Sequence, residues 1–393
     1  MSEDAVGYDA SHITVLEGLE AVRRRPGMYV GSTGERGLHE VVYLLVDRAL
    51  EEVPAGRAGT VDVVLLPEGR VRVADDGPGV PFEAAGGEPC TGLESLLTLL
   101  HTGGRSPFDR HSVIASRFAL GPAVTNALSV RLRAEVRREG LRWAQDYERG
   151  AAVGPPVPHG PTTRTGTTIT FQPDPGVFGT ARCSFDELAE RLRELAFVNR
   201  DLELSLTDRR RTDTTRSVRC RFPGGLRDFV AFLTDRTPAA AAPDITGFEK
   251  EDPRMAGTVE VAMTWTSAPG GHIRSFANSS PTPQGGTHVA GFLDGVAAAV
   301  NAFARERRLP APGAPAVGPD RIGAHLTAVV SVKLDRPEFE GATHGALGGA
   351  AVRRCVREAV REHTVAWLRK DPGPATALLT GADAFPGSGG PEI

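Results

Sequence analysis

Apolar residues recur at helical spacing in several parts of the chain. Helical periodicity appears near 15–23 and again over 38–53, where Gly37 precedes the apolar face. In the stretch SFDELAERLRELAF, Ser184 and Glu187 have the spacing of a capping box, which marks a helix start. Further helices are predicted near the ranges 285–307 and 349–369. The pattern therefore predicts helices in both halves of the chain.

Alternation of apolar and polar residues predicts strands between these helices. TVDVVLLPEGRVRVADDG predicts a β-hairpin that turns at Pro67 to Arg70 and ends in an acidic, glycine-rich loop. LSVRLRAEVRREGLRWAQDY predicts a second hairpin, with its turn near Glu139 and Gly140. The other predicted strands are TGTTITFQPD, LELSLTD, a segment near 257–266 and LTAVVSVKL. Mixed strands and helices in both halves predict two α/β-type sandwiches in tandem.

The length of the chain and the composition of its connecting segments indicate its domain organisation. A chain of 393 residues is expected to form roughly two or three domains. The Ala/Pro-rich connector TPAAAAPDIT marks a transition, and GGLRDFVAFLT before it opens the second unit. Composition also predicts a disordered tail. The expected units are a polar N-terminal arm, two folded domains and the tail, over residues 1–14, 15–222, 223–372 and 373–393.

Charge and cysteine usage exclude several classes of protein. The 45 basic and 49 acidic residues nearly cancel, which argues against a chain-wide electrostatic grip on nucleic acid. No signal peptide starts the chain and no apolar run reaches the ~18 residues that span a bilayer, so we expect a cytoplasmic protein without a membrane partner. Four widely separated cysteines predict buried thiols rather than disulfides or zinc ligands: Cys90, Cys183, Cys220 and Cys355.

A short acidic motif follows the first predicted hairpin. Asp75 ends the strand, and Gly77 and Gly79 come within the next four residues. Two glycines permit a tight backbone turn around a ligand, and a carboxylate at a strand end can accept a hydrogen bond from an exocyclic amine. Acidic glycine turns are also common in ordinary hairpins, so this motif alone leaves a nucleotide site and a simple turn both open.

Further motifs in order along the chain resemble one family. ITVLEGLEAVRRRPGMYVGSTGERGLHEVV, ADDGPGVP, GLESLLTLLHTGG, TNALS and RTGTTITF resemble the ATPase domain of DNA gyrase B subunits and related type IIA topoisomerases. FANSS, QGGTHVAGF, LTAVVSVK and PEFEG resemble the transducer domain of that family. The resemblance runs from Tyr8 to Trp367. It implies an α+β chain, with a GHKL (Bergerat-type) ATPase α/β sandwich followed by a ribosomal-protein-S5-like transducer domain.

The resemblance also implies a nucleotide site, with ATP or ADP as its ligand. It gives Asp75 the role of accepting a hydrogen bond from the adenine amino group, with Thr167 assisting. Tyr8 matches the tyrosine that gyrase arms insert into the neighbouring protomer, which implies a homodimer or a heterodimer with a gyrase B subunit. DNA in the transducer cavity is a further implied partner. The other positions implied around the nucleotide are Gly77, Gly79, Val80, Pro81, Gly121, Arg138, Arg48 and Glu52.

The catalytic positions depart from the family pattern. A glutamate that activates water and an asparagine that holds magnesium are expected in an E-x-x-D-N motif, and this chain has Leu44 and Arg48 there, around a retained Asp47. Leucine cannot accept a proton, and arginine has no lone pair for a cation. Loss of a general base typically costs ~10²- to 10⁴-fold in rate. The substitutions therefore predict impaired hydrolysis and no support for Mg²⁺, and we expect no metal site.

The lid and the transducer loop depart as well. In HSVIASRFALGPAV the glycines expected to bring backbone N–H groups onto the phosphates are replaced, and Gly121 alone is retained; the new residues are Ala115, Ser116 and Ala119. The expected Q-T-K motif of the transducer reads Ala342-Thr343-His344. We expect His344 and His111 to be solvated loop histidines. Triphosphate binding is therefore predicted to be weak.

Arg48 has two alternative interpretations. Pro78 replaces the family's arginine that packs over the base, which deprives Glu52 of its usual partner. Arg48 lies one helical turn before Glu52, so the first interpretation is a structural ion pair between them that plugs the metal site. In the second, the guanidinium replaces magnesium as a counter-charge for phosphate and permits metal-free binding.

Two functional hypotheses follow. The first is a pseudo-ATPase, a gyrase B-like ATP-binding and dimerisation module that acts as a binding or regulatory protein. The alternative is an active, ATP-hydrolysing type IIA DNA topoisomerase ATPase of the gyrase B type that works with DNA and a separate cleavage subunit. No E-G-D-S-A motif and no D-x-D pair follow residue 370, so we expect the cleavage-support domain to be absent. The substitutions in three segments of one site favour the first hypothesis.

Overall fold

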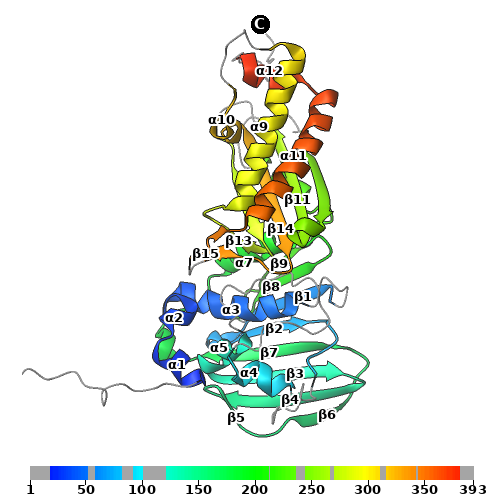
Figure 1. Ribbon diagram of the computed structural model, residues 1–393. Helices are drawn as coiled ribbons and strands as arrows, with labels where there is room; N and C mark the ends of the chain where they lie inside the picture. Colours follow the sequence, from blue (N-terminus) through cyan, green and yellow to red (C-terminus); the bar gives the residue numbers. More distant parts are fainter. Residues whose placement is uncertain are drawn as a thin grey trace, which may run out of the picture.

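The computed structural model describes the chain as two halves arranged along one long axis (Figure 1). The described residues are 18–51, 58–81, 92–100, 121–211, 213–235, 244–265, 270–309, 316–341 and 344–380. Within these ranges no helix is both long and apolar enough to cross a membrane.

The first half is built on a nine-stranded mixed sheet. Its strand order is β5-β4-β3-β7-β2-β1-β8-β9, with β6 paired to β4. The β1/β8 pairing is parallel, and the neighbouring β1/β2 and β8/β9 pairings are antiparallel. The strands are β1 (Thr60–Leu65), β2 (Val71–Asp75), β3 (Ser129–Arg138), β4 (Leu141–Glu148), β5 (Ala151–Ala152), β6 (Val157–Pro161), β7 (Gly166–Pro173), β8 (Glu203–Asp208) and β9 (Arg216–Cys220).

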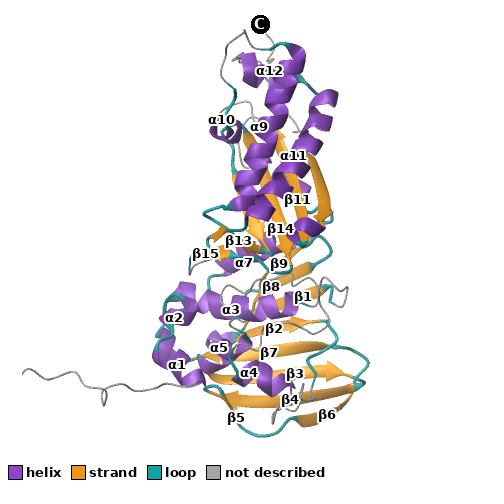
Figure 2. Cartoon of the chain, viewed as in Figure 1, coloured by secondary structure: helices purple, strands orange, loops and turns teal. Residues whose placement is uncertain are grey.

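Helices α3, α5 and α4 lie side by side on one face of this sheet, with α3 near β1 and β2, α5 near β3 and α4 near β5 (Figure 2). The apolar stripe of α3 includes Val41, Leu45 and Ala49, all buried in the core that this half of the chain shares. The helices of this half are α1 (Gly18–Arg24), α2 (Gly27–Val30), α3 (Glu35–Leu50), α4 (Gly92–Thr98), α5 (Pro122–Ala127), α6 (Pro175–Phe178) and α7 (Phe185–Val198), and a 3₁₀ turn covers Pro67–Gly69.

The second half contains a five-stranded sheet in the order β10-β11-β14-β12-β13 and a small β15/β16 ladder. Its strands are β10 (Thr246–Asp252), β11 (Gly257–Trp265), β12 (Ile273–Ala277), β13 (Ser280–Pro281), β14 (Leu326–Leu334), β15 (Phe339–Glu340) and β16 (Ala346–Leu347). Its helices are α8 (Leu226–Asp235), α9 (Thr287–Arg307), α10 (Pro319–Gly323), α11 (Ala350–Lys370) and α12 (Gly373–Thr380), with a 3₁₀ turn at Pro253–Met255.

The central strand β14 is covered on both faces. Val330 and Val332 belong to the core with α9 and α11, whereas Val329 belongs to a second cluster with α8. Burial on both faces explains why its sequence is a continuous apolar run rather than an alternating one.

The two long helices of the second half, α9 and α11, lie side by side (Figure 1). A Cβ atom on Gly291 would lie 2.5 Å from the backbone oxygen of Arg353, and one on Gly295 would lie 2.7 Å from that of Arg357. Only glycine leaves room for the backbones at this separation. These two glycines therefore set the close packing of α9 against α11.

Helix α7 joins the two halves. Near its end, Asn199 Nδ2 donates to Ser279 Oγ at 3.1 Å, and Arg191 Nη2 donates to the Ser279 carbonyl at 3.2 Å. The Phe197 ring stacks on Phe229 of α8 with centroids 4.6 Å apart. An apolar cluster and buried polar contacts thus connect the first half to the second.

Most of the expected elements are present. Both hairpins form, and the second turns through Glu139 and Gly140 at φ values of 54° and 78°. Ser184 Oγ accepts the Glu187 N–H at 3.4 Å, which confirms the predicted helix start. Cys183, Cys220 and Cys355 are buried free thiols, as predicted, and Cys90 lies outside the described residues. The boundary at residues 222/223 stays a prediction.

The prediction of a disordered tail over 373–393 is wrong for its first part. Residues 373–380 form α12, in which Ala375 and Leu378 are buried in the core with α9. The Leu378 carbonyl accepts a hydrogen bond from Arg321 Nη2 at 2.8 Å. The apolar run Ala-Leu-Leu is enough to dock one short helix, although glycine and proline flank it. Residues 381–393 and the arm at 1–14 lie outside the described residues.

Candidate nucleotide site

A buried arginine bridges two of the predicted nucleotide-binding residues. Arg48, near the end of α3, is 9% exposed, and the Asp75 side chain at the end of β2 is 2% exposed. Arg48 Nη1 lies 2.5 Å from Asp75 Oδ2, and Nη2 donates to Thr167 Oγ1 of β7 at 3.1 Å. The guanidinium therefore occupies the acceptors that the adenine amino group was expected to use.

The remaining acceptor atoms of these two residues are also engaged. Asp75 Oδ1 accepts the backbone N–H groups of Gly77 at 3.0 Å and Thr167 at 3.3 Å. Thr167 Oγ1 accepts the Val80 N–H at 3.2 Å in addition to Arg48. A carboxylate offers about four lone-pair positions and a hydroxyl offers two. With Arg48 in place, little capacity is left to accept hydrogen bonds from a purine.

The backbone of the site depends on two glycines with positive φ. A Cβ atom on Gly79 (φ 82°) would lie 2.7 Å from the Arg137 carbonyl oxygen, and one on Gly166 (φ 129°) would lie 2.1 Å from the Asp75 carbonyl oxygen. Arg138 Nη1 donates to the Gly79 carbonyl at 3.0 Å. The loop after β2 is thereby fixed against β3 and β7, which brings distant parts of the sequence into one site.

Leu44 lies one turn before Arg48 and borders a small cavity of about 90 Å³. Two carboxylates on the same helix, Glu40 and Asp47, line this cavity beside Leu44. Burial raises the pKa of Tyr43, which lines it as well, far above its usual value. The rest of the lining comes from α2, α7 and β13: Tyr29, Arg191, Ser280 and Pro281.

The cavity shows a feature that sequence reasoning missed. The spacing of Glu40, Leu44 and Asp47 is four and then three residues, so all three share one face of α3. This spacing was visible in the sequence, but only the structure shows that the face borders a cavity shared with the second half.

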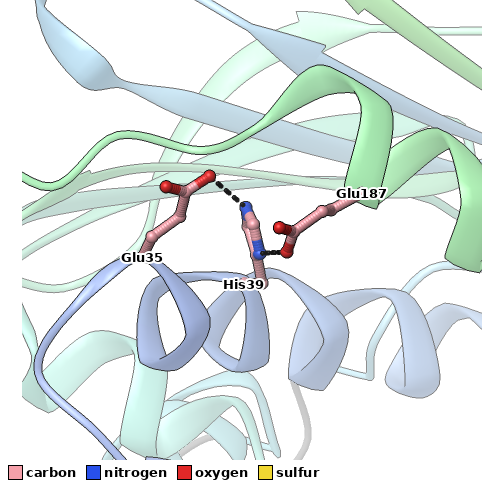
Figure 3. Close-up of side chains that lie close together, drawn as sticks. All are labelled: Glu35, His39 and Glu187. Atoms are coloured by element: carbon pink, nitrogen blue, oxygen red, sulfur yellow. Dashed lines mark ion pairs between the residues drawn. The ribbon is translucent and has the colours of Figure 1, made fainter.

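A second group of side chains links α3 to the start of α7 (Figure 3). His39 is 2% exposed, its Nδ1 lies 3.1 Å from Glu187 Oε2, and its Nε2 lies 3.9 Å from Glu35 Oε1. His39 Nε2 also accepts the Ser184 N–H at 2.9 Å, which fixes the proton on Nδ1. Both ring nitrogens are therefore engaged by protein groups. The group links the two helices; its residues are of types that ligate metals, but both ring nitrogens of His39 already have protein partners.

Several known proteins are similar to this chain in sequence and in fold. Residues 225–383 match the family model described as DNA gyrase B. The 43K ATPase domain of Thermus thermophilus gyrase B, solved in complex with an aminocoumarin, is 31% identical with a TM-score of 0.77, over 92% of this chain and 93% of that one. The chain belongs to the DNA gyrase B family. The topoisomerase IV ATP-binding domain of Francisella tularensis, solved with a small-molecule inhibitor, is 27% identical with a TM-score of 0.78, over 94% and 97%.

Gyrase B proteins of Streptomyces and Mycobacterium are similar along almost the whole chain. The chain is 40% identical over 390 residues to the DNA gyrase B protein of Streptomyces coelicolor, and 38% identical over 406 residues to that of Mycobacterium tuberculosis H37Rv. Each match covers 95% of this chain but only 57% and 59% of the relative, so the chain spans somewhat more than half of their length. These matches confirm the predicted GHKL ATPase and transducer architecture.

Several predicted positions of the gyrase B site are placed by the structure. Gly121 precedes α5, and Thr125 of that helix donates from Oγ1 to the Val41 carbonyl at 3.0 Å, so α5 is fixed against α3. Val80 is buried and the following Pro81 is exposed. The side chains of Leu44 and Arg48 offer no oxygen to a cation. Arg48 therefore does not fit Mg²⁺ at the position where the gyrase family is expected to hold it, and Leu44 does not fit the role of the general base.

Other predicted positions lie outside the described residues: Tyr8, Glu52, His111, Ala115, Ser116, Ala119 and Ala342. The predicted ion pair of Arg48 with Glu52 is thus not described, and the described partners of Arg48 are Asp75 and Thr167 instead. His344 lies in a loop, as expected, but it is not fully solvated. Its ring is half-buried and stacks on Phe339 with centroids 4.6 Å apart, because the β15/β16 ladder brings the two together.

Proposed function

We propose that the chain is a gyrase B-type pseudo-ATPase, a binding or regulatory module in which Arg48 closes the base-recognition site. The bridge from Arg48 to Asp75 and Thr167 carries the proposal. The resemblance assigns the contact with adenine to Asp75 and Thr167. In this chain the side chain of Arg48 binds both of them.

The chemistry of positions 44 and 48 supports the absence of hydrolysis. Leu44 cannot deprotonate water, and loss of a general base costs ~10²- to 10⁴-fold in rate. Displacing Arg48 from Asp75 breaks a buried ion pair, which costs about 3–5 kcal/mol when one partner is left alone. That penalty weakens adenine-nucleotide binding by roughly 10²- to 4 × 10³-fold. Weak binding and slow chemistry therefore reinforce each other.

The proposed partners are other protein chains and DNA. We infer a homodimer, or a heterodimer with a gyrase B subunit, from the resemblance of the N-terminal arm. A row of exposed arginines at four-residue spacing on α11 supports contact with a phosphate backbone; it consists of Arg353, Arg357 and Arg361. Arg353 is paired with Asp294 of α9 at 2.8 Å. Arg357 and Arg361 are therefore the stronger candidates for DNA contact.

An ATP-hydrolysing ATPase of the gyrase B type is the rival function, and one observation favours it. Glu40 and Asp47 line the cavity beside Leu44, so two carboxylates lie within one turn of the position of the family's base. In that function, Glu40 or Asp47 takes the proton from water, and Glu40→Gln or Asp47→Asn abolishes turnover. If the chain is a pseudo-ATPase, neither substitution changes the rate of ATP hydrolysis, because the unaltered protein has none.

Titration calorimetry with ATP and ADP, each with and without Mg²⁺, separates these functions. We expect no saturable binding by the unaltered protein below about 1 mM nucleotide. Arg48→Asn frees Asp75 and should bind ATP at least tenfold more tightly, whereas Arg361→Asn, on the exposed face of α11, serves as the matched control. DNA-stimulated turnover of ATP by the unaltered protein, above a heat-inactivated sample, would overturn the proposal.

A further inference from the structure

The first sheet ends in a strand with an open edge. β9 pairs with β8 from Leu204/Cys220 to Asp208/Arg216, and no other described strand pairs with it. Arg216, Ser217 and Arg219 are exposed and Val218 is half-buried. Alternate N–H and C=O groups along the outer edge of such a strand are available to a further strand. β9 is thus a template for strand addition.

A groove runs between this edge and helix α7. Its volume is about 450 Å³, and it is lined by residues of α7 and β9. Phe185 and Ala189 of α7, both buried, and Val218 of β9 give it an apolar floor. The Arg216 guanidinium lies 4.1 Å above the centre of the Phe185 ring, and Arg216 Nη1 donates to Asp186 Oδ2 at 3.1 Å. The floor can accept one apolar side chain of an added strand.

The charges beside the β9 edge determine which kind of strand can pair with it. The segment from Arg216 to Arg221 holds three arginines and no acidic residue, and Arg193 of α7 also lines the groove. Arg219 is paired with Glu203 at 3.3 Å on an exposed surface, where such pairs are weak. Asp186 and Glu190 face the groove from the α7 side. Arg216 is paired with Asp186 and Arg219 with Glu203, so Arg221 at the end of β9 and Arg193 across the groove supply most of the positive charge that an incoming chain meets.

We infer that the β9 edge docks an extended acidic segment of a partner protein, in which an apolar side chain flanked by acidic ones enters the groove. Backbone hydrogen bonds to β9 supply the pairing, and the arginines supply the charge preference. The site lies on α7 and β9, away from Arg48 and Asp75, so it does not depend on the proposed loss of ATP hydrolysis. Arginines on an edge strand also discourage self-association of the sheet.

Fluorescence polarisation with a labelled peptide of alternating glutamate and valine tests this docking. Two N-methylated versions are compared, one methylated on every glutamate amide and one on every valine amide. In an added strand only alternate amides face β9. We expect one methylated peptide to lose about tenfold or more in affinity and the other to stay within about threefold. Equal affinities of the two would show that no strand is added.

Protein variants test the charge preference. Arg219→Glu with Arg221→Glu should weaken binding of the unmethylated peptide about tenfold, because both charges are reversed beside the edge. Arg305→Glu with Arg307→Glu changes the net charge equally at the exposed end of α9 and should change the affinity by less than about twofold. A lysine/valine peptide should bind more weakly than the glutamate peptide. No binding of the glutamate peptide up to about 1 mM, or equal loss in both double variants, overturns the proposal.

Discussion

Arg48 Nη1 lies 2.5 Å from Asp75 Oδ2, and both side chains are buried. The pair joins α3 to the end of β2, and Thr167 of β7 completes the bridge. In the gyrase B family these positions are expected to serve magnesium and adenine. In this chain the two side chains bind each other, and this contact is the basis of the proposal that the site no longer binds the base.

The first prediction concerns the energy of this pair. Asp75→Asn should lower the free energy of unfolding by about 3–5 kcal/mol, because it leaves a buried guanidinium without its counter-charge. Arg48→Met should cost less, since Asp75 keeps the N–H groups of Gly77 and Thr167. Urea denaturation of both variants and the double variant gives the coupling energy, expected at about 1–3 kcal/mol. Additive effects would show that the two residues do not depend on each other.

The second prediction concerns aminocoumarins. The resemblance gives Pro78 the place of an arginine on which such inhibitors depend, and Arg48 occupies the acceptors of the base pocket. Novobiocin should therefore bind poorly in calorimetry. Pro78→Arg combined with Arg48→Asn should tighten binding at least about tenfold, because both obstacles are removed. Tight binding by the unaltered protein would contradict the role assigned to position 78.

The partners of Arg48 could not be predicted from the sequence. A helical row identifies neighbours four residues away, and it pointed to Glu52. Asp75 is 27 residues away and Thr167 is 119 residues away, so their approach depends on how β2, β7 and α3 pack. The hairpins and the Ser184 helix start were predictable because their signals are local. Helix α12 was missed because glycine and proline dominate the composition around a three-residue apolar run.

The third prediction concerns the contact between α9 and α11. Gly291→Ala or Gly295→Ala should lower the free energy of unfolding by about 1–3 kcal/mol, although alanine favours helices, because the added methyl group meets backbone oxygen at 2.5 or 2.7 Å. Gly27→Ala is the matched control, since a Cβ atom there meets no atom within 4 Å. Thermal denaturation should separate the two classes. Unchanged stability in Gly291→Ala would mean that the helices can move apart freely.

The fourth prediction concerns acid. His288, in the first turn of α9, is fully buried beside Thr282, and burial lowers its pKa from 6.5 to about 4. Between these values the unfolded chain binds the proton and the folded chain does not, so stability is complete above pH 6.5 and falls as the pH drops towards 4. The decrease in the free energy of unfolding should approach about 3 kcal/mol. In His288→Gln the free energy of unfolding should no longer decrease in this way between about pH 7 and about pH 4.5. In the control His159→Gln, at an exposed position, the decrease should remain. If the free energy of unfolding of His288→Gln decreased as steeply as that of the unaltered protein, other groups would be responsible for the acid sensitivity.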